Sequence, residues 1–191
     1  MIRYVLAILL IAGPAPALAE DSAPGLALWG KIHEVFSHPR CANCHVGGDR
    51  VPMWSGPEYG ATPRPHGMHI SAKGGDDGTG YLACTTCHSK QNSLTPHGPP
   101  GATSPKGEAE WQLAPVQMQW FGKSSAEICK QFKDPERNGE RKTIAELVHH
   151  VTTEPLVRWA WTVGRERRPP YSAEQLGKLI EDWGSAGAPC P

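Results

Sequence analysis

Hydrophobic residues recur at helical spacing in the segment 23–36, the first element that the pattern predicts. The apolar positions are Leu26, Trp29, Ile32, Val35 and Phe36. Positions three or four residues apart lie on one face of an α-helix, so this spacing predicts an amphipathic helix. Pro39 favours a helix end just before it. The helix therefore leads directly to Cys41.

Three further helices are predicted from their first residues. In each case a hydroxyl side chain is followed three positions later by Glu or Gln, which is the reciprocal capping box. The pairs are Ser124 with Glu127, Thr143 with Glu146, and Ser172 with Gln175. Apolar residues then recur at helical spacing. They are Ile128 and Phe132; Ile144, Leu147, Val148 and Val151; and Leu176, Leu179, Ile180 and Trp183.

The segments between these helices have no hydrophobic period. Residues 46–80 and 92–122 are rich in glycine and proline, which are typical of turns and loops. No segment shows the alternation of a half-buried strand. We expect a mostly α-helical fold with long ordered loops and little or no strand.

Residues 1–19 have the three parts of a secretion signal. There is a positive charge at Arg3, an apolar run over 4–12, and small residues at Ala17 and Ala19. The apolar run is shorter than the ~20 residues needed to span a bilayer. We expect cleavage after Ala19 and a soluble periplasmic protein with no stable membrane insertion. A retained N-terminal anchor is the alternative.

The predicted mature chain, 20–191, has 172 residues and a nearly neutral charge. Without Arg3 it has 18 lysines and arginines against 19 aspartates and glutamates, which gives no support for binding nucleic acid or a membrane surface. Its length fits one domain. With 21 glycines and 19 prolines in the whole sequence, we expect a small apolar core supported by a covalent cross-link or a prosthetic group.

The pattern C-x-x-C-H occurs twice, at 41–45 and at 84–88. Two thiols three positions apart can add to the two vinyl groups of a haem, and the histidine that follows can bind the iron. Chance placement of six cysteines and nine histidines would give only about 0.01 copies. We expect two covalently attached haem c groups. Their binding residues are Cys41, Cys44, His45, Cys84, Cys87 and His88.

Two other uses of the motif cysteines remain open. The four thiols could bind a structural zinc ion, although the 39 residues between the two pairs exceed the usual separation in compact zinc modules. A disulfide framework is permitted in an exported protein. Neither alternative gives a role to His45 or His88. The export signal also favours haem, because its covalent attachment is completed outside the cytoplasm.

The two cysteines outside the motifs are Cys129 and Cys190. In an oxidising compartment a disulfide between them is the simplest interpretation. It would close a loop of about sixty residues and stabilise the fold by about 4 kcal/mol in the chain-entropy model. Two separate buried thiols are the alternative.

The function depends on the axial position opposite His45 or His88 at each iron. A protein ligand there leaves electron transfer as the main option, whereas an open position allows ligand binding or peroxide chemistry. The available candidates are His33, His38, His66, His69, His97, His149, His150, Met53, Met68 and Met118.

Position within the chain favours His66 and His150 as the distal ligands. At about 100° per residue, His150 lies closer than His149 to the apolar face of its predicted helix. In the segment PHGMHI, His66 and Met68 lie beside glycine and proline, which let the backbone approach a flat ligand closely. Met68 is the next candidate after His66.

Tryptophan and arginine offer further contacts to a porphyrin. Seven tryptophans suit a core built around porphyrin faces, although ordinary helix packing explains Trp29 and Trp183 equally well. Four arginines could pair with propionates, surface charge being the alternative for each. They are Arg50, Arg64, Arg137 and Arg158.

The 43 positions from Cys41 to Cys84 are too few for a complete single-haem cytochrome c domain, so tandem domains of that kind do not fit. Both haems are expected to share the domain 20–191.

Several segments of the chain carry a resemblance to a known family. They are FSHPRCANCHVGGDRVP, PHGMHI, CTTCH, WQLAP, EICKQFKDPERNG, LVHHV and GAPCP. Together they resemble a family of small exported bacterial dihaem c-type cytochromes, often labelled as an isoquinoline 1-oxidoreductase subunit. The resemblance implies the CxxCH attachment residues and a molybdenum hydroxylase as redox partner, and His66 and His150 match histidines of the pattern.

These observations predict a periplasmic dihaem cytochrome c. It would transfer electrons between a periplasmic oxidoreductase or quinol-linked donor and a downstream acceptor, rather than act as an enzyme. The alternatives are a dihaem peroxidase-like enzyme and a haem-based sensor, each with one open iron position. The short chain and the many candidate ligands argue against the first, and the lack of a signalling domain argues against the second.

Overall fold

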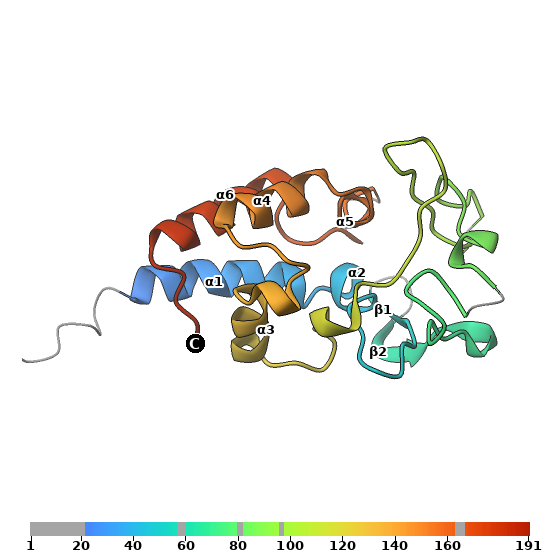
Figure 1. Cartoon of the computed structure of the whole chain (residues 1–191), viewed down its shortest axis with the longest axis horizontal. Coiled ribbons are helices and arrows are strands. Elements are labelled where there is room, and N and C mark those ends of the chain that lie inside the picture. Colours follow the sequence, from blue (N-terminus) through green and yellow to red (C-terminus); the bar gives the residue numbers. More distant parts are fainter. Residues whose placement is uncertain (1–21, 57–59, 80–81, 96–97, 163–166) are drawn as a thin grey trace, which may run out of the picture.

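Helices form one end of the molecule and long loops form the other (Figure 1). The computed structural model describes residues 22–56, 60–79, 82–95, 98–162 and 167–191. The predicted signal peptide and His97 lie outside the described residues. Most of the regular structure is helical, as the hydrophobic pattern predicts.

Four helices enclose the main apolar core. They are α1 (Ala23–Phe36), α3 (Ser125–Phe132), α4 (Ile144–Thr153) and α6 (Ala173–Ser185). Helix α1 lies against both α3 and α6, and α6 also packs on α4 (Figure 1). The buried core residues are Trp29, Ile32, Val35, Phe36, Trp120, Ile128, Cys129, Phe132, Leu147, Val151, Leu176, Ile180 and Trp183. The apolar faces predicted from the sequence therefore meet in one cluster.

Two glycines of α6 allow α4 to approach it closely. A Cβ atom at Gly184 would lie 2.7 Å from the Ile144 side chain, and one at Gly177 would lie 2.9 Å from Thr152. Real Cβ atoms essentially never come so near, so larger residues here would separate the helices. The position of α4 matters because this helix carries His150.

All three predicted capping boxes are present. The side chains of Ser124, Thr143 and Ser172 accept hydrogen bonds from the N3 backbone, and each N3 side chain bonds back to the N-cap backbone. These reciprocal bonds satisfy donors that the first helical turn leaves unpaired. The starts of α3, α4 and α6 are thus determined by local sequence.

The capping box at Ser124 should make stability depend on acid. Hydrogen bonds from the backbone and hydroxyl of Ser124, with help from Lys123, lower the pKa of Glu127 from 4.5 to about 2. Because the folded pKa is depressed, this stabilisation is present above pH 4.5 and is lost as the pH falls towards 2. Glu127→Gln should therefore lower the melting temperature at pH 6 but not at pH 2.

Thermal unfolding at several pH values tests this expectation. Glu181→Gln, an exposed change within α6, is the matched control and should have little effect at either pH. If the difference in melting temperature between Glu127→Gln and the wild type stayed constant from pH 6 to pH 2, the lowered pKa of Glu127 would be contradicted.

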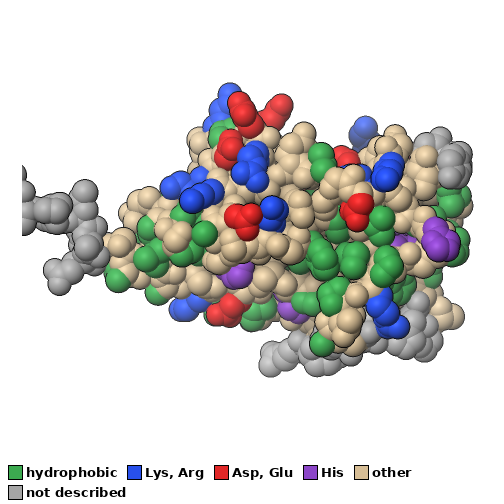
Figure 2. Space-filling view, turned by 90° about the horizontal axis from the view of Figure 1, so that it is seen from below, with side chains coloured by type: hydrophobic (Ala, Val, Ile, Leu, Met, Phe, Trp, Pro, Cys, Tyr) green, Lys and Arg blue, Asp and Glu red, His purple; other side chains and the backbone are tan. Residues whose placement is uncertain are grey.

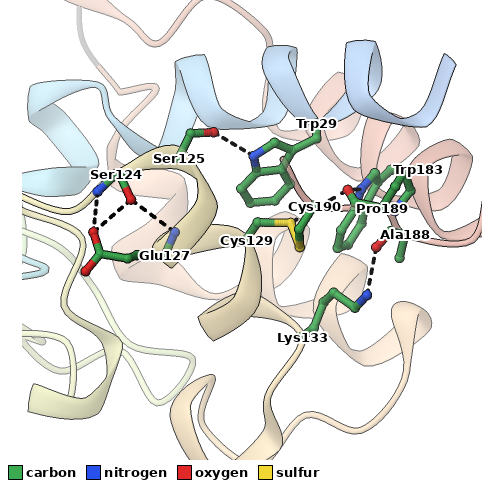
Figure 3. The surroundings of a disulfide bond; sticks show 10 residues. All are labelled: Trp29, Ser124, Ser125, Glu127, Cys129, Lys133, Trp183, Ala188, Pro189 and Cys190. Atoms are coloured by element: carbon green, nitrogen blue, oxygen red, sulfur yellow. Dashed lines mark hydrogen bonds between the residues drawn. A yellow bond between two sulfur atoms is a disulfide. The ribbon is translucent and has the colours of Figure 1, made fainter. Parts of the chain in front are cut away.

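A disulfide ties the C-terminal tail to α3 (Figure 3). Cys129 and Cys190 are joined, with Cα atoms 5.6 Å apart. The same tail accepts a hydrogen bond at the Pro189 carbonyl from the Trp183 indole (2.9 Å) and one at the Ala188 carbonyl from Lys133 (2.8 Å). This is the disulfide predicted for the two cysteines that lie outside the C-x-x-C-H motifs. It holds the C-terminal tail against the end of the helical core.

The structure contains a short antiparallel sheet that the hydrophobic pattern does not predict. Strand β1 (Met53–Gly56) pairs with β2 (Gly60–Pro65), and Met53 lies opposite Pro65. All residues of β2 are exposed, so neither face imposes an alternation of polar and apolar residues. The short sheet is compatible with the expectation of little strand, but the long loop expected over 46–80 contains these two strands.

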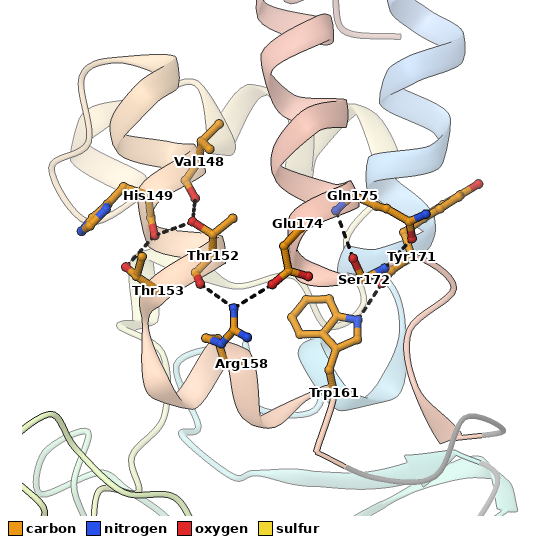
Figure 4. A network of polar contacts seen from close by, with 10 residues as sticks. All are labelled: Val148, His149, Thr152, Thr153, Arg158, Trp161, Tyr171, Ser172, Glu174 and Gln175. Carbon is orange, nitrogen blue, oxygen red and sulfur yellow. Dashed lines mark hydrogen bonds and ion pairs between the residues drawn. The ribbon is translucent and has the colours of Figure 1, made fainter.

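Short helices connect the larger elements. They are α2 (Pro39–Ala42), α5 (Pro155–Trp159), η1 (Gly67–His69), η2 (Cys84–Thr86), η3 (Val116–Met118) and η4 (Pro135–Arg137). Helix α5 is held in place by Arg158, which donates to the Thr152 carbonyl (2.7 Å) and to Glu174 (3.0 Å) (Figure 4). Nearby, the Trp161 indole donates to the Tyr171 carbonyl (2.6 Å). These contacts join α4, α5 and the start of α6.

Charged side chains of both signs are interspersed on the face shown in Figure 2, and histidine is exposed at its loop-rich end. This mixture agrees with the nearly neutral composition. Over the part of the chain that the structure describes, no helix has the length and apolar character needed to cross a membrane.

Candidate functional site

The first C-x-x-C-H motif begins on α2 and continues into a tight turn. Cys44 donates from its backbone to the carbonyl of Cys41 (3.2 Å), and His45 donates to that of Ala42 (3.2 Å). Helix α2 is capped by His38, whose Nδ1 accepts from the Arg40 backbone (3.2 Å). His38 therefore has a structural role beside the motif.

The second motif repeats this turn on η2. The backbone N–H groups of Cys87 and His88 both donate to the Cys84 carbonyl, at 3.2 and 3.0 Å. A single helical turn places the two thiols on one side and the histidine just beyond them. Both motifs thus have a single hydrogen-bonded turn at their two cysteines.

The two motif histidines are oriented by the same kind of hydrogen bond. The Nδ1 atom of His45 lies 2.7 Å from the Met118 carbonyl, and that of His88 lies 2.8 Å from the Pro100 carbonyl. A carbonyl oxygen can only accept, so Nδ1 carries the proton in each ring. The lone pair is then on Nε2, and such a bond orients an imidazole that binds a metal.

Each motif histidine also lies flat against a tryptophan. The rings of His45 and Trp120 are 3.6 Å apart and tilted by 3°, and those of His88 and Trp111 are 4.6 Å apart and tilted by 2°. Stacking on one face and a hydrogen bond at Nδ1 leave little freedom for ring rotation. The sequence shows the tryptophans but not these pairings, which join residues far apart in the chain.

Burial keeps both motif histidines neutral. It lowers the pKa of His45 to about 4, although the hydrogen bond to Met118 acts in the opposite direction. It also lowers the pKa of His88. Burial raises the pKa of Cys41 to about 12 and that of Cys44 to about 11. At neutral pH the imidazoles are therefore unprotonated at one ring nitrogen, and the thiols carry the proton.

A cavity of about 310 Å³ opens beside the first motif. This volume is at the lower end of the range for ligand pockets, roughly 300–1,000 Å³. Its wall is largely apolar and aromatic, and Cys41, Cys44 and His45 all reach it. The three residues are only partly exposed, and the cavity accounts for part of that exposure. The other aromatic side chains of the wall are Phe36, Trp111, Trp120, Phe132, Trp159 and Trp161.

The ring of His66 lies close to that of His88. Their ring centroids are 6.1 Å apart. Two imidazoles that bind one metal from opposite sides, with metal–nitrogen bonds of about 2 Å, have centroids about 6 Å apart. The Nδ1 atom of His66 donates to the Gly67 carbonyl (2.8 Å), so its lone pair is also on Nε2.

The ribbon β1–β2 brings His66 to this position. The backbone N–H of His66 donates to the Pro52 carbonyl (2.8 Å), and its ring contacts Trp54 edge to face at 5.5 Å. Met68, the next sequence candidate, is 76% exposed. Its neighbour His69 is exposed as well, so within this segment only His66 combines partial burial with contact to a motif histidine.

His150 lies on the wall of the cavity that also contains His45. The structure therefore brings the second predicted distal residue to the first motif, and leaves its neighbour His149 exposed, as the helical pattern predicts. The Nδ1 atom of His150 is 2.8 Å from a guanidinium nitrogen of Arg141. Its surroundings therefore differ from those of His45, His66 and His88.

The other histidine and methionine candidates have different positions. His33 lies on α1, outside the cavity wall, with its ring 6.5 Å from that of Trp29. Met53 packs against a small second cluster formed by Val46, Ala72 and Leu113. Met118 lines the cavity, but its carbonyl already accepts from His45 on the side away from Nε2.

The four motif cysteines are free thiols in the structure. Within the described residues, no group of three or more histidine, cysteine, aspartate or glutamate side chains is arranged to hold a metal ion. A structural zinc site needs four such ligands. In the described residues the four thiols are therefore neither grouped as zinc ligands nor joined by disulfides.

Among the predicted propionate partners, two arginines are already paired. Arg50 is buried and forms an ion pair with Asp76, and it also donates to the Ala114 carbonyl (2.9 Å). Arg158 pairs with Glu174 (3.0 Å). Arg137 is exposed. The arginines that reach the cavity are Arg40 and Arg141, which the sequence analysis did not select.

Arg40 is the residue directly before Cys41, and this adjacency is the one signal that could have identified it. Its guanidinium lies 3.7 Å from the centre of the Trp159 ring and donates to the carbonyls of Trp159 and Ala160, at 3.0 and 2.8 Å. Arg40 thus joins the first motif to α5.

Comparison of the chain with protein-family models, with curated proteins and with solved structures finds no match.

Proposed function

We propose that this protein is a periplasmic dihaem c-type cytochrome that transfers electrons. The observation that carries the proposal is the repetition of one arrangement at both motifs. In each, the histidine of C-x-x-C-H donates from Nδ1 to a backbone carbonyl and lies parallel to a tryptophan. Two independent copies of an oriented imidazole beside two thiols fit two attached haems.

The residues have distinct roles in this proposal. Cys41 and Cys44 hold one haem and Cys84 and Cys87 hold the other, while His45 and His88 are the proximal ligands. Haem c supplies a reversible one-electron change when bound. The protein orients each imidazole, excludes water with apolar and aromatic walls, and offers positive charge from Arg40 near the first site.

The second site supports electron transfer most directly. The ring centroids of His66 and His88 are 6.1 Å apart, so these two side chains would hold the haem iron of the second motif and leave no position for a substrate. His66 is only partly buried at the loop-rich end, so this site lies near the surface. A redox group that lies close to the protein surface can exchange electrons readily with another protein.

The proposed partners are redox proteins. By the resemblance of the sequence, a molybdenum hydroxylase is the proposed electron donor, and a quinol-linked donor would be served by the same chemistry. The interspersed charges on the face in Figure 2 suit transient docking rather than binding to nucleic acid.

Haem content tests the proposal. The protein produced with a c-type maturation system should hold two haems per chain, counted by the pyridine haemochrome spectrum and by mass. Cys41→Ser with Cys44→Ser should leave one, and so should Cys84→Ser with Cys87→Ser. Cys129→Ala with Cys190→Ala is the matched control and should keep both. A wild-type protein that binds zinc at the motifs and no haem would overturn the proposal.

Electron transfer is tested by a redox titration. Two reversible one-electron steps, with rapid reduction by a small donor and rapid oxidation by a second cytochrome, are the expected result. Two attached haems that cannot be cycled in this way would leave the attachment intact and refute the transfer role.

A further inference from the structure

The cavity beside the first motif contains a pair of side chains that the electron-transfer proposal does not use. Arg141 and His150 both line it, together with His45. They come from the segment before α4 and from α4 itself. They are among the few polar groups of a largely apolar wall, which also include Arg40, Gln112, Asn138 and Glu154. Ligand pockets are commonly apolar with a few placed polar groups, so this pair is the feature to explain.

The contact between these two side chains determines the tautomer of His150. One guanidinium nitrogen of Arg141 lies 2.8 Å from the Nδ1 atom of His150. Arginine has donors and no acceptor, so Nδ1 must be the acceptor. A neutral imidazole has one N–H, and in His150 this N–H is therefore on Nε2. An imidazole whose Nδ1 accepts a hydrogen bond and whose only N–H is on Nε2 is neutral.

Arg141 is held in this orientation by its own loop. It also donates to the carbonyl of Asn138 and, at 3.4 Å, to that of Gly139. Asn138 is 2% exposed and is bonded to the Phe132 carbonyl and to both backbone groups of Arg141, at 2.8–2.9 Å. A buried asparagine with these bonds makes the loop rigid, so the guanidinium is aimed at His150 before any ligand arrives.

The two predicted distal histidines are therefore in opposite states. His66 donates from Nδ1 to a carbonyl and presents a lone pair at Nε2. His150 accepts at Nδ1 and presents an N–H at Nε2. Only the first arrangement suits an axial ligand. Met118 does not replace His150, because its backbone already lies behind His45.

We infer that His150 is a hydrogen-bond donor to an external ligand, and that the sixth position opposite His45 is open to a small molecule. The ligand class is a diatomic gas or a peroxide-like molecule, which combines a lone pair for iron with an acceptor for the N–H of His150. This inference rests on the proposed function, since it assumes a haem at the first motif. It gives the two sites different tasks, because the second site exchanges electrons and the first binds the ligand.

Carbon monoxide is the probe. Haem content is measured first on the full-length holoprotein, so that a failure of attachment is recognised separately. With two haems present and reduced, the wild type should bind one carbon monoxide per chain. Binding of none would overturn the inference while leaving the electron-transfer proposal intact.

The infrared C–O stretch of that complex reports the role of His150. An N–H donor to the bound molecule lowers this frequency, so His150→Ala should raise it while one carbon monoxide per chain still binds. His150→Gln keeps an N–H donor and should restore part of the shift. If the wild type binds none and His150→Ala binds one, His150 is an axial ligand and the inference fails. An unchanged frequency in His150→Ala would also overturn it.

The variant Arg141→Leu tests whether Arg141 acts by setting the tautomer of His150 or only by packing. Without the guanidinium, the ring can place its proton on Nδ1 and bind the iron through Nε2. The variant should therefore bind less carbon monoxide than the wild type and show a larger low-spin fraction. Adding His150→Ala to Arg141→Leu should restore binding of one molecule per chain. A carbon monoxide complex of Arg141→Leu that is identical to that of the wild type would refute the role of Arg141.

Discussion

Replacing His66 with alanine should leave two haems on the chain but add one high-spin haem to the spectrum. His66 is the residue whose ring lies 6.1 Å from His88 with its Nε2 lone pair available. In the proposed dihaem protein, its loss would remove the nitrogen opposite His88 and open that position. The reduced variant should consequently bind one more carbon monoxide per chain than the wild type. Absorption and electron paramagnetic resonance spectra at constant haem content measure the change.

His69→Ala is the matched control for this variant. His69 lies in the same short helix as Met68, is exposed, and should leave the spectrum unchanged. Met68→Leu tests the runner-up directly, because the side chain of Met68 is 76% exposed and is not expected to bind iron. Conversion to high spin in Met68→Leu, with none in His66→Ala, would transfer the ligand assignment to Met68.

Removal of the disulfide should lower the free energy of unfolding by about 4 kcal/mol, on the chain-entropy estimate for a loop of this length. Cys129 and Cys190 are 61 positions apart, so the bridge restricts a long segment of the unfolded chain. In the folded protein Cys129 is fully buried beside α1 and α6, and alanine at both positions also loses some packing. Denaturant unfolding of Cys129→Ala with Cys190→Ala measures the difference.

A reductant provides the internal control for the disulfide. Thioether bonds to haem resist dithiothreitol, so the reagent should destabilise the wild type by a similar amount and leave the double variant unaffected. Equal stability of the wild type and the double variant would mean that the tail is held by the hydrogen bonds of Trp183 and Lys133 alone.

The helices could be predicted because their signals are local. The boxes at Ser124, Thr143 and Ser172 each lie within four residues, and each forms in the structure. The helix expected over 23–36 is α1 with the same bounds. In these segments, capping and amphipathic spacing favour the same element, and tertiary packing reinforces them.

The β1–β2 ribbon could not be predicted, because it has no local signal in the sequence. Its second strand is exposed and contains two prolines, Pro63 and Pro65, so neither alternation nor strand propensity marks it. Its stability comes from pairing with β1 and from contacts with the first motif. Information of that kind is absent from any short window of sequence.

The surroundings of the motif histidines depend on distant residues. His45 bonds to a carbonyl 73 positions away, and its stacking partner Trp120 follows two residues later. The contact between Arg141 and His150 is closer in sequence, but it depends on the loop around Asn138. Side-chain type identified the candidates, whereas tautomer and ring orientation required the fold.

The ribbon makes the two attachment motifs mechanically interdependent. Asn43, a residue inside the first motif, accepts at its carbonyl from Met53 (2.9 Å) and exchanges side-chain hydrogen bonds with Ser55 at 2.9 and 3.3 Å. The other strand leads to His66, beside the second motif. In the proposed dihaem protein, the hydrogen bonds of this strand pair would therefore connect the turn that carries Cys44 with the residue beside His88.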